Sequence, residues 1–293
     1  MISTRGICIL FAGLVFLPVA AAELGAGPGV AAAVTQGIEL KGNFVQGGLV
    51  TGRAPPGSRV SLDGKPIRLG ADGRFLLGFG RDAKGKAMLV VRTPLGAVEK
   101  RALAIKKRRY RTQRISGLPR KMVTPPAHVM ARIRTDAAAI RKARLHDSDQ
   151  PMFDSGFMWP AKGPITGVYG SRRILNGKPR RPHFGVDIGS PTGTPVVAAA
   201  SGIVRITEKD MYFTGGTVLI DHGYGLNSVY SHMATVRVTL GQRVAQGDLI
   251  GTIGATGRVT GAHLDWRVNL FLTRLDPALL VGPMDNGLPK SKP

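Results

Sequence analysis

Short apolar stretches separated by turn residues fill the chain from about residue 37 to residue 106. They lie at Ile38–Leu40, Val60–Leu62, Phe75–Phe79 and Met88–Val91. Asp-Gly pairs between such stretches favour tight hairpin turns. About seven short strands at this spacing predict a small immunoglobulin-like β-sandwich over residues 35–106. This segment contains no histidine, so we expect a spacer or docking module without a catalytic site.

A second set of β-prone stretches begins near residue 153. We predict strands at Ile165–Gly170, Pro195–Ala200, Gly202–Ile206, Thr217–Asp221, Leu226–His232, Val236–Val238, Asp248–Ile253 and His263–Leu270. Asn176–Gly177 is typical of a hairpin turn. The pattern predicts a mostly antiparallel β-domain over residues 153–280, followed by a flexible tail over residues 281–293.

The segment between these two regions is strongly basic. Lys and Arg crowd residues 100–121, and no acidic residue occurs between Glu99 and Asp136. Pro125–Pro126 then precedes an Ala-rich stretch with apolar residues at helical spacing, which predicts a helix from Ala127 to about Leu145. We therefore expect a basic linker plus a helix over residues 107–152. The linker is either a solvated connection or an electrostatic tether to an anionic envelope surface.

The first residues have the pattern of a Sec-type signal peptide. Arg5 precedes the apolar run Ile7–Val19, and three alanines end at Ala22. This predicts a signal peptide over residues 1–22 and export to the periplasm or cell envelope, with an uncleaved anchor as the alternative. The single cysteine, Cys8, lies inside it, so the mature chain would form no internal disulfide.

The formal net charge of the chain is +23. Such a chain is attracted to polyanions. We see no basic recognition helix and no aromatic residues interleaved with the basic run, so no nucleic-acid partner is expected. An exported protein meets acidic wall polymers and anionic lipid, which are the better candidates. We expect a monomer.

His183 and Asp187 form the first candidate metal-binding pair. A helix would place both on one face, but Gly185 and the glycines and prolines after residue 188 argue against a helix. In a fully extended chain their Cα atoms would stand roughly 13 Å apart. We therefore predict a bend at Gly185, with His183 in a loop and Asp187 entering a strand.

Further candidates lie downstream. His232 sits in the β-prone run Val229–Met233. In the predicted strand from His263, residues i and i+2 point to one side, so His263 and Asp265 share a face. A catalytic metal needs about three protein ligands, an open position for water and a nearby general base. These five residues could fill those roles.

The ordered set of motifs resembles a known family. It comprises His-x-x-x-Asp, then Tyr-x-His-Met, then Gly-x-x-x-Gly-x-His-x-Asp, and spans roughly Met158 to Pro277. This set is similar to that of the lysostaphin-type (LytM-like) zinc metallopeptidases, which cut peptidoglycan cross-bridges. The resemblance implies a mainly β chain with a barrel-sandwich-like antiparallel peptidase domain.

The resemblance also implies the role of each site residue. One Zn²⁺ would be held by His183, Asp187 and a third ligand, which is histidine in the usual pattern and Asp265 here. His263 would be the general base, and His232 would polarise the substrate carbonyl and stabilise its oxyanion. Two carboxylates make the centre less positive than usual and loosen its selectivity, so another divalent metal could replace zinc.

Three functions remain in consideration. The first is a zinc metalloendopeptidase that hydrolyses peptide cross-links or stem peptides of peptidoglycan. The second is a degenerate, non-catalytic LytM-like protein that binds peptidoglycan or activates a cell-wall amidase. The third follows from Val244–Gly251, which looks like the turn of a lipoyl-type carrier domain. Such a carrier needs an exposed hairpin lysine, and Lys209 is the one lysine between Gly185 and His263.

Overall fold

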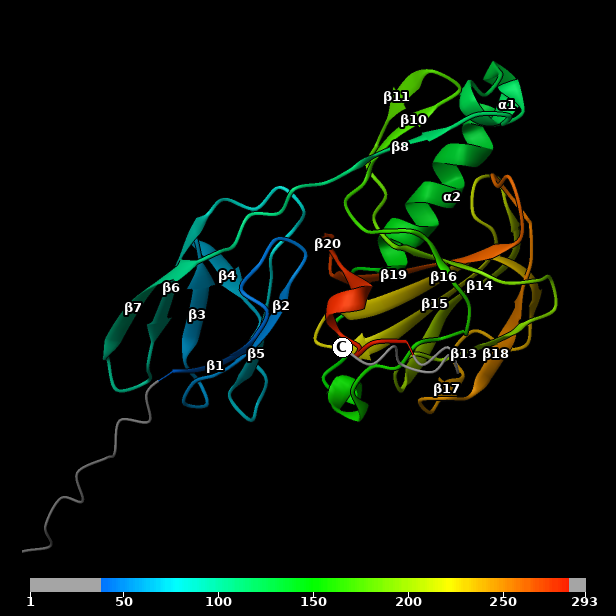
Figure 1. Cartoon of the computed structure of the whole chain (residues 1–293). Coiled ribbons are helices and arrows are strands. Elements are labelled where there is room, and N and C mark those ends of the chain that lie inside the picture. The colour runs from blue at the N-terminus through cyan, green and yellow to red at the C-terminus, as the bar shows by residue number, and fades with distance from the viewer. Residues whose placement is uncertain (1–37, 285–293) are drawn as a thin grey trace, which may run out of the picture. The chain divides into compact units, whose positions relative to one another are not determined.

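The computed structural model describes residues 38–284 of the chain. Residues 1–37 and 285–293 lie outside the described part, and so do the predicted signal peptide and most of the predicted tail. The described residues are mainly β, as predicted, and include one helix of more than four residues (Figure 1). Within residues 38–284, no helix is long and apolar enough to span a membrane.

The N-terminal strands form two small sheets around one core. One sheet has the order β1-β2-β5 and the other the order β4-β3-β6-β7. Residues of both sheets, such as Phe75, Leu77 and Leu89, are fully buried in a common cluster, so the sheets pack as a sandwich and the predicted count of strands is confirmed. The strands are β1 (Glu39–Gly42), β2 (Leu49–Arg53), β3 (Arg59–Leu62), β4 (Lys65–Ile67), β5 (Arg74–Gly78), β6 (Lys86–Arg92) and β7 (Val98–Ala104).

The basic segment contains a strand that the sequence did not predict. β8 pairs in parallel with β10 (Arg172–Leu175), which pairs with β11 (Lys178–Arg180). In β8 exposed residues alternate with partly buried ones, and the strand reads Thr-Gln-Arg-Ile, so it lacks the apolar alternation that marks a strand. The predicted helix is confirmed as η1 and α2. The elements are β8 (Thr112–Ile115), α1 (Arg120–Val123), η1 (Ala127–Val129), α2 (Met130–Ala143) and η2 (Met152–Ser155).

The C-terminal part is built on one ten-stranded sheet whose pairings are all antiparallel. Its main path runs β17-β14-β15-β16-β19-β12-β9. The elements are β9 (Ile165–Gly167), β10 (Arg172–Leu175), β11 (Lys178–Arg180), β12 (Val186–Gly189), β13 (Pro195–Val197), β14 (Gly202–Met211), β15 (Gly215–Gly223), β16 (Leu226–Val236), β17 (Arg243–Val244), β18 (Leu249–Ile253), β19 (His263–Leu270), β20 (Thr273–Leu275) and η3 (Pro277–Leu279).

β16 corrects one detail of the prediction. The sequence predicted one strand ending at His232 and another at Val236–Val238, but β16 is continuous through Val236. His232 has a φ of +68°, and the pairing of β16 with β18 shifts register between Met233 and Thr235. The backbone at His232 is therefore irregular within one continuous strand and does not form a turn.

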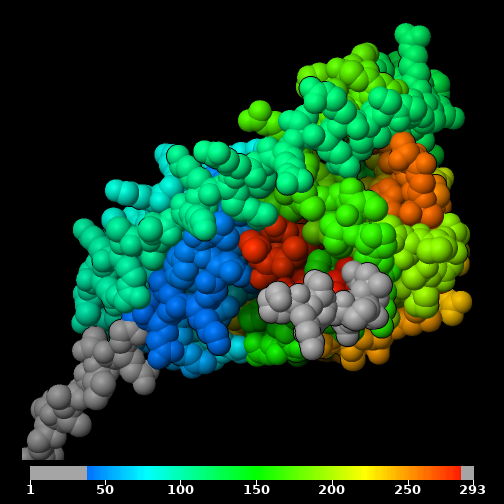
Figure 2. All heavy atoms as spheres, viewed as in Figure 1, coloured from blue at the N-terminus to red at the C-terminus, as the bar shows by residue number. Residues whose placement is uncertain are grey.

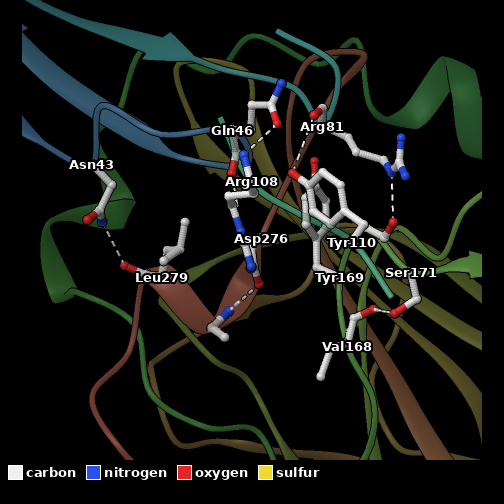
Figure 3. A network of polar contacts seen from close by, with 12 residues as sticks. Asn43, Gln46, Arg81, Arg108, Tyr110, Val168, Tyr169, Ser171, Asp276 and Leu279 are labelled. Carbon is white, nitrogen blue, oxygen red and sulfur yellow. Dashed lines mark hydrogen bonds and ion pairs between the residues drawn. The ribbon is translucent and has the colours of Figure 1, made fainter. Parts of the chain in front are cut away.

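A hydrogen bond joins the N-terminal sandwich to the loop that supports His183 (Figure 3). The Arg81 side chain donates to the carbonyl of Gly170 over 2.7 Å. Gly170 N–H donates in turn to the His183 carbonyl over 2.8 Å, and His183 N–H donates to Ser171 over 2.9 Å. Arg108 and Asp276 form an ion pair of 2.7 Å in the same network. The backbone on both sides of His183 is thus fixed.

Candidate metal centre

The chain bends at Gly185, as the sequence predicts. His183 lies in the loop before the bend, and β12 begins directly after it. A Cβ atom on Gly185 would lie 2.6 Å from each of three atoms, which belong to Asp265, Trp266 and Arg267. Real Cβ atoms essentially never approach other atoms this closely. Glycine is therefore required where the ligand loop passes β19.

The register of β12 against β19 brings two carboxylates together. Asp187 lies opposite Asp265 in this antiparallel pair, and Gly189 lies opposite His263. The predicted faces of β19 are confirmed, because Leu264 and Trp266 are fully buried in the core. Asp265 consequently points away from that core and toward Asp187.

Three of the five candidate residues form one buried group. His183, Asp187 and Asp265 each offer a ligand atom, and these atoms lie within 4.8 Å of one another. The three residues are 1%, 6% and 1% exposed. Among the described residues, neither ring nitrogen of His183 nor Oδ1 of Asp187 has a hydrogen bond of good geometry, although Nε2 of His183 lies only 3.0 Å from Oδ1 of Asp187. Buried atoms without partners are costly, and one nitrogen with two carboxylates is a donor set that zinc accepts. The residues fit a divalent cation.

The other two candidates lie beside this group. The His232 and His263 ring centroids are 4.8 Å apart, and Nε2 of His263 is 3.8 Å from Oδ1 of Asp187. Nδ1 of His232 contacts the Thr256 carbonyl at 2.8 Å, and Nδ1 of His263 contacts the Gly261 carbonyl at 2.9 Å.

These carbonyl contacts set the protons on both rings. A carbonyl oxygen only accepts, so Nδ1 carries the proton and Nε2 is left with a lone pair in each neutral ring. Burial, the largest influence, lowers the pKa of His232 to about 4. At neutral pH, His232 therefore presents an acceptor at Nε2, and it can donate to an oxyanion only after it gains a proton.

Two arginines that the sequence analysis missed hold the carboxylates. Arg173 on β10 donates to Oδ2 of Asp187 over 2.7 Å. Arg267 donates through Nε to Oδ1 of Asp265 over 2.9 Å, and its terminal nitrogen donates to Oδ2. Arg267 could have been found, because it lies two residues after Asp265 in the predicted strand and so shares its face. No sequence signal connects Arg173 to Asp187.

These ion pairs keep both carboxyls ionised. Burial raises the pKa of Asp187, but the contact with His183 and the charge of Arg173 outweigh burial, and the pKa lies below its usual value. Burial also raises the pKa of Asp265, and Arg267 holds this pKa well below its usual range. The two carboxylate ligands alone would make the centre less positive than the usual site. The two guanidinium groups add two positive charges beside them.

The remaining histidines do not join this group. His222 is fully buried, with its ring nitrogens 2.7 Å from the Ser201 carbonyl and 2.8 Å from the Ser228 hydroxyl. Burial, the largest influence, lowers the pKa of His222 to about 4. The ring is thus a satisfied part of the core. His128 and His146 are exposed.

The segment around α1 covers one side of the loop between β18 and β19. Figure 2 shows the orange surface of that loop directly below the green surface that includes α1. The Arg258 side chain donates to the Met122 carbonyl over 3.4 Å, and its guanidinium lies 4.3 Å from the centre of the Phe213 ring. A cavity of about 360 Å³ opens between Met122, Tyr212 and Gly257.

Replacing Gly185 with alanine should disrupt this site. The new methyl group would have to displace the backbone of Trp266 or the side chains of Asp265 and Arg267. We expect zinc affinity to fall by about 10- to 100-fold, which is the usual effect of losing a residue that positions a metal ligand. Competition with a chromophoric chelator measures this change. Gly282→Ala is the matched control, because a Cβ there meets no atom within 4 Å and Gly282 lies outside the site. Equal affinities of the two variants would contradict the prediction.

Residues 181–277 match the model of Peptidase family M23. The chain is 32% identical over 161 residues to the cell division protein DipM of Caulobacter vibrioides, covering 55% of this chain and 25% of that protein. It is 36% identical over 111 residues to the peptidoglycan DD-endopeptidase ShyA of Vibrio cholerae, covering 38% and 26%. The chain thus spans about a quarter of the length of these curated relatives.

Among solved structures, a peptidase M23 from Pseudomonas aeruginosa is similar to the chain over most of its length. The TM-score is 0.64 and the sequence identity 29%, and the match covers 83% of this chain and 96% of that chain. Because the match extends well beyond residues 181–277, the likeness includes elements that precede the family-matched segment.

Proposed function

With residues 181–277 matched to peptidase family M23, we propose that this protein is an exported zinc metalloendopeptidase that hydrolyses peptide cross-links or stem peptides of peptidoglycan. The observation that carries the proposal is the buried group of His183, Asp187 and Asp265 beside two histidines. The likeness to the peptidoglycan DD-endopeptidase ShyA supports peptidoglycan as the class of substrate.

The metal would be held by one ring nitrogen of His183 and by one oxygen from each aspartate. A bound zinc ion supplies an activated water and polarises the peptide carbonyl. Nε2 of His183 lies 3.0 Å from Oδ1 of Asp187, so one cation could contact both atoms. Because two of the three donors are carboxylates, another divalent metal could occupy the same position.

His263 is the proposed general base. Its Nδ1 proton is held by the Gly261 carbonyl, which fixes the ring and turns the Nε2 lone pair toward Asp187 Oδ1. His263 takes the proton from the attacking water at Nε2 and delivers it to the leaving amine. His263 has 19% of its side chain accessible, so it can reach both the water and the substrate.

His232 is the proposed oxyanion contact. It must carry a second proton at Nε2 to donate, because Nδ1 is engaged with Thr256. Burial opposes this protonation and lowers the pKa of His232 to about 4. A developing negative charge on the substrate oxygen favours the protonated ring, so the contact would form as the reaction proceeds and not before it.

The N-terminal parts would hold the enzyme at the envelope. We keep the division into an immunoglobulin-like module (35–106), a basic segment with a helix (107–152) and a peptidase domain (153–280). Exposed cations follow one another along the basic segment at Lys106, Lys107, Arg109 and Arg111. They support attraction to an anionic envelope surface. The following residues of this segment form β8, which pairs with β10.

A second candidate is a non-catalytic protein that binds peptidoglycan or activates a cell-wall amidase. The ion pairs of both carboxylates favour it, because arginines neutralise Asp187 and Asp265 without any metal. The unpartnered nitrogens of His183 count against it, because no arginine satisfies them among the described residues.

Digestion of purified peptidoglycan tests the proposed function. The zinc-loaded protein should release soluble fragments with new amino termini. A strong chelator should stop the release, and added zinc should restore it. Absence of fragments from the zinc-loaded protein would reject the peptidase proposal, and stimulation of an added amidase in that case would support the second candidate.

A further inference from the structure

We propose that Arg267 is a positioning residue of the metal site, which holds Asp265 as the third ligand and balances the charge of the second carboxylate. This inference rests on the proposed metal site, but it concerns how the site is built and not which bond it cuts. It is therefore tested by metal affinity and not by hydrolysis.

Arg267 and Asp265 form a bidentate ion pair. Nε and a terminal nitrogen of Arg267 reach the two oxygens of Asp265. A planar guanidinium that contacts both oxygens fixes the plane of the carboxylate as well as its position. Asp265 has 2% of its side chain accessible and Arg267 has 23%. A single rotamer of Asp265 is thus held from one side, and the opposite side is left for a cation.

The two facing carboxylates need positive charges beside them. Asp187 and Asp265 are directly opposite each other in the β12–β19 pair, where like charges repel. Arg173 pairs with one of them and Arg267 with the other. The two negative charges of the ligands are therefore offset by two positive charges, and a divalent ion bound there keeps its electrophilic character.

The candidate ligands keep lone pairs that are free to bind a metal. An ionised carboxylate has about four acceptor positions, and Arg267 uses one on each oxygen of Asp265. Oδ1 of Asp187 and both nitrogens of His183 remain without hydrogen bonds in the described chain. Each of the three residues can therefore still offer a lone pair to one cation.

Arg267 does not itself substitute for the metal. A guanidinium in the metal position would donate to His183 or to Oδ1 of Asp187. The described structure shows hydrogen bonds of Arg267 to Asp265 but none to these atoms. A buried carboxylate oxygen and a buried imidazole lone pair left without partners would be costly. A cation that both reach removes this cost, and Arg267 then positions one of the ligands.

The proposal makes Asp265 and Arg267 interdependent. With histidine at position 265, Arg267 loses its counter-charge and leaves an unpaired, partly buried positive charge beside the cation. Asp265→His alone should therefore weaken zinc binding, although histidine is the better zinc ligand. Removing the arginine as well should restore binding, because a neutral ligand needs no counter-charge.

Zinc affinity of four variants tests this dependence, measured by competition with a chromophoric chelator on the full mature chain. We expect Arg267→Gln to weaken binding by about 10- to 100-fold. The zinc affinity of Arg267→Lys should lie between those of the wild type and Arg267→Gln, because a lysine keeps the positive charge but cannot contact both carboxylate oxygens in the same way. Asp265→His should bind less tightly than the double variant Asp265→His/Arg267→Gln. Arg237→Gln is the control, because Arg237 is exposed.

The outcomes separate this inference from the proposed function. A wild-type chain that binds no zinc overturns both. Wild-type affinity in a folded Arg267→Gln overturns the role of Arg267 and leaves the metal site intact. If Arg267→Gln does not fold, the comparison of Asp265→His with the double variant decides. Equal affinities of those two would overturn the proposal, and a gain in the double variant would support it.

Discussion

Replacing Asp265 with alanine is expected to abolish both zinc retention and peptidoglycan hydrolysis. The change leaves two protein ligands, His183 and Asp187, and it removes the counter-charge of Arg267. An unpaired guanidinium then faces the position of the cation, and repulsion adds to the lost ligand. We expect zinc affinity to fall by more than about 100-fold, which exceeds the usual effect of removing a support behind a ligand.

Zinc content after dialysis and the release of peptidoglycan fragments measure this effect together. Asp82→Ala is a suitable control, because Asp82 is 78% accessible and pairs only with Arg81 in the described structure. Circular dichroism shows whether Asp265→Ala remains folded. Unchanged zinc occupancy in a folded Asp265→Ala would mean that Asp265 is not a ligand.

Replacing His263 with alanine is expected to separate binding from chemistry. His263 contributes no atom to the group of three ligands, so zinc should remain bound. Turnover should fall by about 10²- to 10⁴-fold, which is the usual contribution of a general base. The pair of results, retained zinc and lost turnover, distinguishes a base from a ligand.

His232→Ala is the informative comparison, because both rings present an Nε2 lone pair to the site. A larger loss of turnover in His232→Ala, with zinc retained, would make His232 the base. Loss of zinc in His263→Ala would make His263 a ligand. His128→Ala should change neither quantity, since His128 is exposed and lies outside the group.

The sequence predicted the parts of the site that depend on local rules. The bend at Gly185 follows from the unsuitability of glycine and proline for a helix, and it places His183 and Asp187 correctly. The shared face of His263 and Asp265 follows from the two-residue period of a strand. β19 occupies the predicted range, His263–Leu270. These features need no knowledge of distant contacts.

The sequence could not predict the features that depend on tertiary pairing. β8 is a strand because β10 pairs with it, and its own residues carry no apolar alternation. Arg173 reaches Asp187 across the space between two sheets, and a lone arginine in a basic chain gives no signal of this. Arg267 was within reach of the same two-residue rule that linked His263 with Asp265. It was missed because the ligands were counted without their counter-ions.

These two arginines change the charge of the centre. Ligand counting alone predicts a cation neutralised by two carboxylates, with a weakly acidic water. With Arg173 and Arg267 in hydrogen-bond contact with those carboxylates, the local charge returns toward that of a site with fewer carboxylates. The substitution of aspartate for histidine therefore does not by itself indicate an inactive site.

X-ray absorption at the zinc edge of the zinc-loaded protein tests the metal site most directly. We predict one zinc ion with one imidazole nitrogen and two carboxylate oxygens from the chain, at about 2.0–2.2 Å. The same spectrum of Asp265→Ala should lose one oxygen or lose the metal. A spectrum with no imidazole, or one that is unchanged by Asp265→Ala, would contradict a metal site formed by His183, Asp187 and Asp265.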